Sequence, residues 1–162
     1  MANGNAGIKG RTKLPYATMS IDEIEQMPVQ ALADTGAHLW LWTTNSFLHS
    51  AFHVMAAWGF TFLSPITWVK PSGFGCYFVN TTQHCLFGYY KTCRFPQARY
   101  LLTHFEANPT EHSAKPAAFY DIVRKVSPGP RIDLFNRREI PDFEGWGNEV
   151  PPPQLKLWDS AK

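Results

Sequence analysis

The stretch His38-Leu39-Trp40-Leu41-Trp42-Thr43-Thr44 begins a unit of one predicted strand and one predicted helix, from which the rest of the chain can be interpreted. Leu and Trp alternate in it with little polarity, which predicts a buried strand. Asn45 or Ser46 then provides a helix cap. The following apolar residues recur at helical spacing and predict an amphipathic helix that Gly59 ends; they are Phe47, Leu48, Ala51, Phe52, Met55 and Ala56.

Before this unit, Ser20 and Glu23 have the spacing of a capping box. A short helix is expected to follow, to bury Ile21, Ile24 and Met27, and to end at Pro28. Residues 1–13 are rich in Gly and Asn without a hydrophobic period, which predicts a flexible loop.

After this unit, the apolar pattern predicts more strands and one helix that begins at Pro116 and runs to about Val126. The expected strands are 60–70, bent or divided at Pro65, then 82–90, 99–103 and 131–135. Residues 71–80, 105–113 and 136–149 are expected to be loops or linkers, and residues 151–162 a Pro-rich tail. Residues 14–150 thus form one predicted domain, an α/β sheet with helices on both faces.

Composition limits the classes of protein. The chain has 162 residues, 44% hydrophobic and 17% charged, which is typical of one globular domain. A net charge of +2 provides no polybasic coat, although basic residues gather in the last third. Three cysteines without CxxC spacing favour a reducing, intracellular compartment. Neighbouring His84 and Cys85 are expected on opposite faces of a strand, which argues against a shared metal.

No signal peptide is recognised at residues 1–13, and no apolar run approaches the roughly 20 residues that span a bilayer. We therefore expect no membrane partner.

Six short motifs occur in a fixed order along the chain. They are Leu14-Pro15-Tyr16-Ala17-Thr18-Met19-Ser20, Trp40-Leu41-Trp42-Thr43-Thr44-Asn45, Ile66-Thr67-Trp68-Val69-Lys70, Glu111-His112-Ser113-Ala114-Lys115-Pro116, Asp133-Leu134-Phe135-Asn136-Arg137 and Trp146-Gly147-Asn148-Glu149. In this order they resemble the permuted N6-adenine methyltransferase family, which includes messenger-RNA and adenine-DNA methylases. The resemblance spans Leu14 to Glu149 and implies a Rossmann-like sheet and S-adenosylmethionine as methyl donor.

Two residues have a chemical reason to contact this cofactor. Lys115 precedes the helix that Pro116 opens, where a cation and free backbone amides can meet a carboxylate. Asp133 ends a predicted strand and can accept hydrogen bonds from ribose hydroxyls, or pair structurally with Arg137. The resemblance implies the same cofactor contacts and adds others; the full set is Lys115, Asp133, Arg137, Asn148 and Glu149.

The resemblance also places five residues near the substrate: Tyr16, Trp42, Asn45, Lys70 and His112. Tyr16 can stack on the target base or staple the following helix. For Trp42 a place in the core is favoured. For Lys70, at a strand end, contact with a substrate phosphate is favoured.

The family's catalytic Asp-Pro-Pro-Trp does not occur in residues 1–162, so no catalytic residue is assigned. The resemblance implies that its carboxylate holds the adenine amine and that the strand leading to it is central in the sheet. A truncated product, a chain complemented by another polypeptide, or a non-catalytic partner would each explain this.

The expected function is N6-adenine methylation of nucleic acid, with DNA favoured over RNA, in the cytoplasm if the source is bacterial or phage. The alternatives are an inactive homologue that serves as a nucleic-acid-binding or scaffold subunit, and an unrelated α/β domain whose motifs match by chance.

Overall fold

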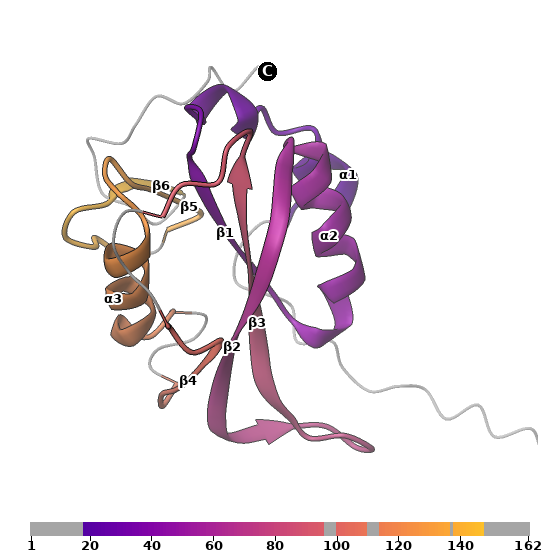
Figure 1. Cartoon of the computed structure of the whole chain (residues 1–162). Coiled ribbons are helices and arrows are strands. Elements are labelled where there is room, and N and C mark those ends of the chain that lie inside the picture. Colours follow the sequence, from indigo (N-terminus) through magenta and orange to yellow (C-terminus); the bar gives the residue numbers. More distant parts are fainter. Residues whose placement is uncertain (1–17, 96–99, 110–113, 137, 148–162) are drawn as a thin grey trace, which may run out of the picture.

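The computed structural model describes residues 18–95, 100–109, 114–136 and 138–147, and it contains two small sheets with three α-helices around them (Figure 1). The predicted loop 1–13 and the predicted tail 151–162 lie outside the described residues. None of the described helices is long and apolar enough to cross a membrane.

The larger sheet has four strands: β1 (His38–Thr43), β2 (Phe60–Phe74), β3 (Asn80–Tyr90) and β4 (His104–Glu106). Their order is β1-β3-β2-β4, with β3 antiparallel to both neighbours and β4 parallel to β2. The mixed α/β class predicted from the sequence is therefore confirmed, with a sheet that is mostly antiparallel.

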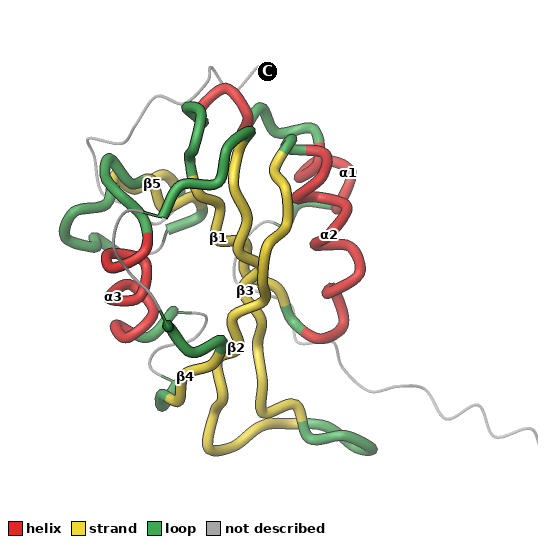
Figure 2. The backbone as a smooth tube through the Cα atoms, in the orientation of Figure 1, coloured by secondary structure: helices red, strands yellow, loops and turns green. Residues whose placement is uncertain are grey.

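The Leu–Trp alternation of β1 supplies both faces of this sheet, because successive strand residues point to opposite sides. Leu39 and Leu41 pack on the core beneath α1 (Ile21–Glu25) and α2 (Leu48–Ala57). Trp40 and Trp42 pack on the second core, beneath α3 (Ala117–Val126). The helices thus cover both faces, with α1 and α2 on one side and α3 on the other (Figure 2).

Strand β3 is central in the sheet and provides the most buried side chains. Leu86 is 0% exposed in the first core, and Cys85, also 0% exposed, lies in the second. His84 lies on the other face from Cys85, where its Nδ1 is 3.0 Å from Thr67 Oγ1. The expectation that His84 and Cys85 diverge is confirmed.

The capping box of Ser20 and Glu23 is present, but α1 ends at Glu25, before Pro28. Ile21 and Ile24 are only partly buried, whereas Met27 is buried beyond the helix. The short helix makes its apolar contacts mainly with α2 through the shared core.

The predicted cap of α2 is wrong. Residues Asn45–Phe47 form a 3₁₀ turn, and α2 begins at Leu48 without a side-chain cap. The Asn45 side chain bonds to β3 instead, at Asn80 and Thr82. The buried stripe of α2 is centred on Ala51, Val54 and Met55, so Phe47, Phe52 and Ala56 from the predicted stripe are exposed. Gly59, with a φ of 77°, ends this unit as predicted.

Four other expectations were wrong in part. Strand β1 is half-buried throughout, because it lies at the sheet edge. Residues 71–80 are not wholly a loop, since β2 continues to Phe74 and β3 starts at Asn80. The strand expected at 99–103 is found at His104–Glu106, and β6 (Glu144–Trp146) lies in the expected loop 136–149.

The second sheet pairs β5 (Ile132–Leu134) with β6 in parallel. Leu134 and Trp146 pack against the same core as Leu39 and Leu41, so this sheet lies beside β1 (Figure 1). Among the described strands, β1 pairs only with β3 and β5 only with β6. The two sheets therefore adjoin through their cores without a hydrogen-bonded ladder between them.

The β2–β3 hairpin extends beyond the sheet and carries an apolar tip, defined as residues 74–79 (Figure 1). Phe74 is 92% exposed, Tyr77 97% and Phe78 84%. A Cβ on Gly75 would collide with the backbone oxygen of Phe78, so the tight turn needs glycine there. No Asp, Glu, Lys or Arg occurs in residues 71–90.

Candidate cofactor and substrate site

Lys115 lies between the end of β1 and the start of α3. Its Nζ is 4.6 Å from the ring centroid of Trp42, and it donates a 3.1 Å hydrogen bond to Gln83 Oε1 on β3. Pro116 caps α3 in an extended conformation, so the backbone turns into the helix directly after Lys115. The cation is thus held by an aromatic face and an amide at a helix start, where an anion is favoured.

Asp133 lies in β5, opposite α3. Tyr120 on α3 donates a 3.0 Å hydrogen bond from its hydroxyl to Asp133 Oδ2. Burial raises the pKa of Asp133, while the Tyr120 hydroxyl and the charges of Arg138 and Lys115 partly oppose that rise. The charges of Arg138 and Lys115 thus both act on the Asp133 carboxylate.

Arg137, the partner of Asp133 in the predicted structural pair, lies outside the described residues. Arg138 is the described arginine whose charge acts on Asp133. Its guanidinium donates a 2.8 Å hydrogen bond to the Lys115 backbone oxygen, which ties the loop after β5 to the start of α3. Arg138 thus connects the segments that carry the two predicted cofactor residues.

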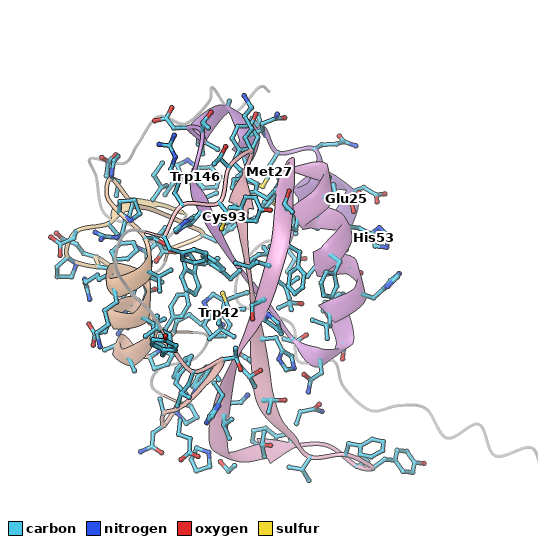
Figure 3. The ribbon with its side chains drawn as sticks, in the orientation of Figure 1. Glu25, Met27, Trp42, His53, Cys93 and Trp146 are labelled. Carbon is cyan, nitrogen blue, oxygen red and sulfur yellow. The ribbon has the colours of Figure 1, made fainter. Side chains whose placement is uncertain are left out.

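Trp42 lies on the α3 side of the sheet, within the second core (Figure 3). Its ring makes edge contacts with Trp68 at 6.2 Å and with Phe119 at 4.8 Å between centroids. Its buried indole Nε1 has no hydrogen-bond partner. Trp42 is therefore a core residue, as favoured from the sequence, that also has one free donor beside Lys115.

Two other predicted substrate residues lie around this aromatic group. Lys70 Nζ lies 5.5 Å from the ring centroid of Trp68, next to Trp42. Asn45 donates a 2.9 Å hydrogen bond to Asn80 Oδ1 at the start of β3. The structure thus connects Lys115, Trp42, Trp68 and Lys70 by ring contacts, whereas Asn45 belongs to a polar group beside the hairpin.

Tyr16, His112, Asn148 and Glu149 lie, like Arg137, outside the described residues, so their predicted contacts stay predictions. Within the described part of the chain, no group of three or more His, Cys, Asp and Glu side chains could hold a metal ion.

Sequence reasoning missed three polar residues of the site. Gln83 and Tyr120 bind Lys115 and Asp133 directly. Asn136 is buried, and its Nδ2 has no hydrogen-bond partner, although its Oδ1 accepts from the Arg138 backbone. The position of Gln83 in the alternation of β3 was the one available signal, because it shares a face with Cys85.

Replacing Asp133 by Asn is expected to make the ligand-free protein more stable at neutral pH. The folded-state pKa of Asp133 is raised, so stability falls as the pH rises from the ordinary pKa of 3.8 through the raised folded-state pKa. The cost disappears below the ordinary pKa of 3.8, where the group is protonated in both states. Urea unfolding of the wild type and D133N should therefore converge at low pH and separate as the pH rises. A less stable D133N at pH 7 would contradict this.

Residues 5–149 of the chain match the model of the MT-A70 family. The chain belongs to the MT-A70 family. This family consists of S-adenosylmethionine-dependent methyltransferases. The resemblance expected from the motif order is confirmed.

This MT-A70 chain is similar to curated methyltransferases from bacteria and animals. It is 26% identical to the Type II methyltransferase M.MunI of a Mycoplasma species over 148 residues, covering 88% of this chain and 63% of the relative. It is 30% identical to an N(6)-adenosine-methyltransferase MT-A70-like protein of Drosophila melanogaster, covering 85% and 24%. It is 27% identical to the human N(6)-adenosine-methyltransferase catalytic subunit METTL3, covering 85% and 26%. The chain therefore spans less than two thirds of each relative.

Proposed function

We propose that this MT-A70 chain binds S-adenosylmethionine and forms part of an N6-adenine methyltransferase that acts on nucleic acid. The observation that carries the proposal is that Lys115 and Asp133, which are separated in sequence, are bound to the same two elements. Arg138, from the loop after β5, donates to the Lys115 backbone oxygen, and Tyr120 of α3 donates to Asp133. The names of the relatives, which include adenosine methyltransferases and a Type II methyltransferase, support the reaction.

Each cofactor residue has a defined task in this proposal. The Lys115 ammonium pairs with the cofactor carboxylate, and Asp133 accepts hydrogen bonds from the ribose hydroxyls. S-adenosylmethionine supplies the methyl group when bound. The residues outside the described part, Arg137, Asn148 and Glu149, are proposed to close the same site.

The carboxylate that holds the adenine amine is proposed to come from an added strand between β1 and β5. Both strands have edges unpaired among the described residues, and their side chains share one core. A strand there would join the two sheets into the Rossmann-like sheet expected from the sequence. The carboxyl end of that strand would lie near Trp42 and Asp133. The buried indole Nε1 of Trp42 is a hydrogen-bond donor without a partner there.

That strand would be supplied by a preceding segment of a longer polypeptide or by a partner methyltransferase subunit. The second candidate function, an inactive scaffold subunit, is favoured by one observation, since no Asp-Pro-Pro-Trp occurs in residues 1–162. In both cases Lys70 and Asn45 are proposed to face the nucleic acid, with Tyr16 and His112 beside them. DNA is proposed over RNA.

All three cysteines are free thiols. This supports our further proposal that the protein works in a reducing, intracellular compartment. We propose no membrane partner.

Replacing Lys115 by Ala is expected to raise the dissociation constant for S-adenosylmethionine by about 10- to 100-fold, since a charge-assisted hydrogen bond is lost. Isothermal titration calorimetry on the full chain measures this. Lys125→Ala is the matched control, because Lys125 is exposed in the last turn of α3 and should leave the affinity unchanged. If the wild type binds no S-adenosylmethionine, or K115A binds it equally well, the proposed cofactor site is wrong.

A further inference from the structure

Tyr120 is a buried residue whose hydroxyl makes one hydrogen bond, to Asp133 Oδ2. The bond crosses from α3 to β5 and is 3.0 Å long. A buried phenol needs a partner for its hydroxyl, but a backbone oxygen would serve as well. The partner of the Tyr120 hydroxyl is a carboxylate of the candidate site, which suggests that Tyr120 has a role beyond packing.

The ring of Tyr120 is held on two sides. Its centroid is 5.5 Å from that of Phe119 and 5.3 Å from that of Phe143, with both pairs edge-on. Such contacts fix the ring direction, so the hydroxyl remains at one place relative to β5. Because Lys115 directly precedes Pro116, the same helix start fixes the positions of Lys115 and Tyr120.

The charges around the Asp133 carboxylate come from three segments. Tyr120 faces it from α3, Lys115 from the segment before α3, and Arg138 from the loop after β5. Burial and the charge of Asp133 raise the pKa of Tyr120, so the phenol stays protonated and remains a donor throughout the neutral range. One carboxylate oxygen of Asp133 is therefore always occupied by this donor.

We infer that Tyr120 is a positioning residue for cofactor binding: it holds Asp133 Oδ2 so that Oδ1 is directed to a vicinal diol such as the ribose of S-adenosylmethionine. This rests on the proposed function. A carboxylate held at one oxygen loses little rotational freedom when a ligand binds the other, so its contact with the diol is more favourable. Tyr120 itself does not touch the ligand.

A merely structural Tyr120 would give a different result from a positioning one. Tyr120→Phe removes the hydroxyl and keeps the ring. Without this donor, which lowers the pKa of Asp133, the carboxyl should protonate at a higher pH. Loss of packing between α3 and β5 would lower stability but would not shift that titration in a defined direction.

The test compares the wild type, Y120F and the control Y89F by calorimetry with S-adenosylmethionine over a pH series that runs from the ordinary Asp pKa of 3.8 up into the neutral range. Tyr89 lies on β3, and its hydroxyl makes no hydrogen bond within the described structure. We expect Y120F to weaken binding about tenfold at pH 7. We also expect the pH at which binding is halved to move upward in Y120F and not in Y89F.

A second measurement keeps the inference separate from the proposed function. Carboxyl ¹³C NMR of the ligand-free protein follows the titration of Asp133 directly, with D133N used for assignment. An upward shift in Y120F supports the positioning role even if the ligand is not S-adenosylmethionine. An unchanged titration, or weaker binding without a shift of the pH midpoint, overturns it. If the wild type binds no cofactor but the titration shifts, the proposed function fails, and what stands is the hydrogen bond by which Tyr120 lowers the pKa of Asp133.

Discussion

Adenine methylation by this chain is expected to rise at least about a hundredfold when an Asp-Pro-Pro-Trp strand is supplied with it. The reason is that the proposed site has groups assigned to a methyl donor but no carboxylate assigned to the adenine amine. An oriented acceptor for that amine acts in the transition state, where removing one preorganised group typically costs about 10²–10³ in rate. We propose that this strand lies between β1 and β5, whose other edges are unpaired among the described residues.

The experiment fuses a segment that ends in Asp-Pro-Pro-Trp to residue 1, or adds it as a separate polypeptide. Transfer of labelled methyl groups to DNA and RNA oligomers is then measured with the full chain. The matched control carries Ala-Pro-Pro-Trp, which can fill the same place without the carboxylate. Equal rates for the two fusions, or full activity without either, would refute this account of the carboxylate. Inactivity of both fusions despite cofactor binding would favour the scaffold alternative.

Replacing Leu86 by Ala is expected to lower the free energy of unfolding by about 2–5 kcal/mol. Leu86 is 0% exposed, lies on the central strand β3, and is opposite Leu41 in β1 and Pro65 in β2. Neighbours on both strands prevent the cavity from collapsing easily, so both the transfer and the cavity costs apply. Such a loss is a large fraction of the stability of a small domain.

Leu63→Ala is the matched control, because Leu63 lies in β2 and is 45% exposed. It removes the same atoms from the surface and should change stability by about 0.5 kcal/mol or less. Chemical denaturation of both variants gives the comparison. If L86A is no less stable than L63A, the assignment of β3 as the centre of the sheet is wrong.

Strand β1 could be predicted because Leu and Trp alternate, and the two cores follow from that alternation. Lys115 could be proposed because it precedes a predicted helix, and Asp133 because it was expected to end a predicted strand, although the structure places it in the middle of β5. Strand β6 could not, because Glu144-Gly145-Trp146 is too short to show a period and pairs only through β5. The cap of α2 failed because Asn45 found tertiary partners, which local rules do not contain.

The length of the two strands in the β2–β3 hairpin was underestimated for a physical reason. Pro71, Gly73 and Gly75 are turn signals, yet Gly73 lies in β2, where a Cβ would meet the backbone of Asn80. Glycine was needed there for a close approach of two strands and not for a loop. Tyr120 was missed because its bond to Asp133 depends on how α3 docks on the sheet, which no sequence spacing specifies.

The apolar tip also has a practical consequence for the purified protein. Three aromatic rings stand almost fully in water, and the neighbouring residues carry no charge to keep two molecules apart. Sulfate and phosphate buffers strengthen contacts between such surfaces. Concentrated protein solutions in these buffers will therefore favour self-association through the apolar tip. Dilute samples in chloride salts are the conditions under which the single molecule is best studied.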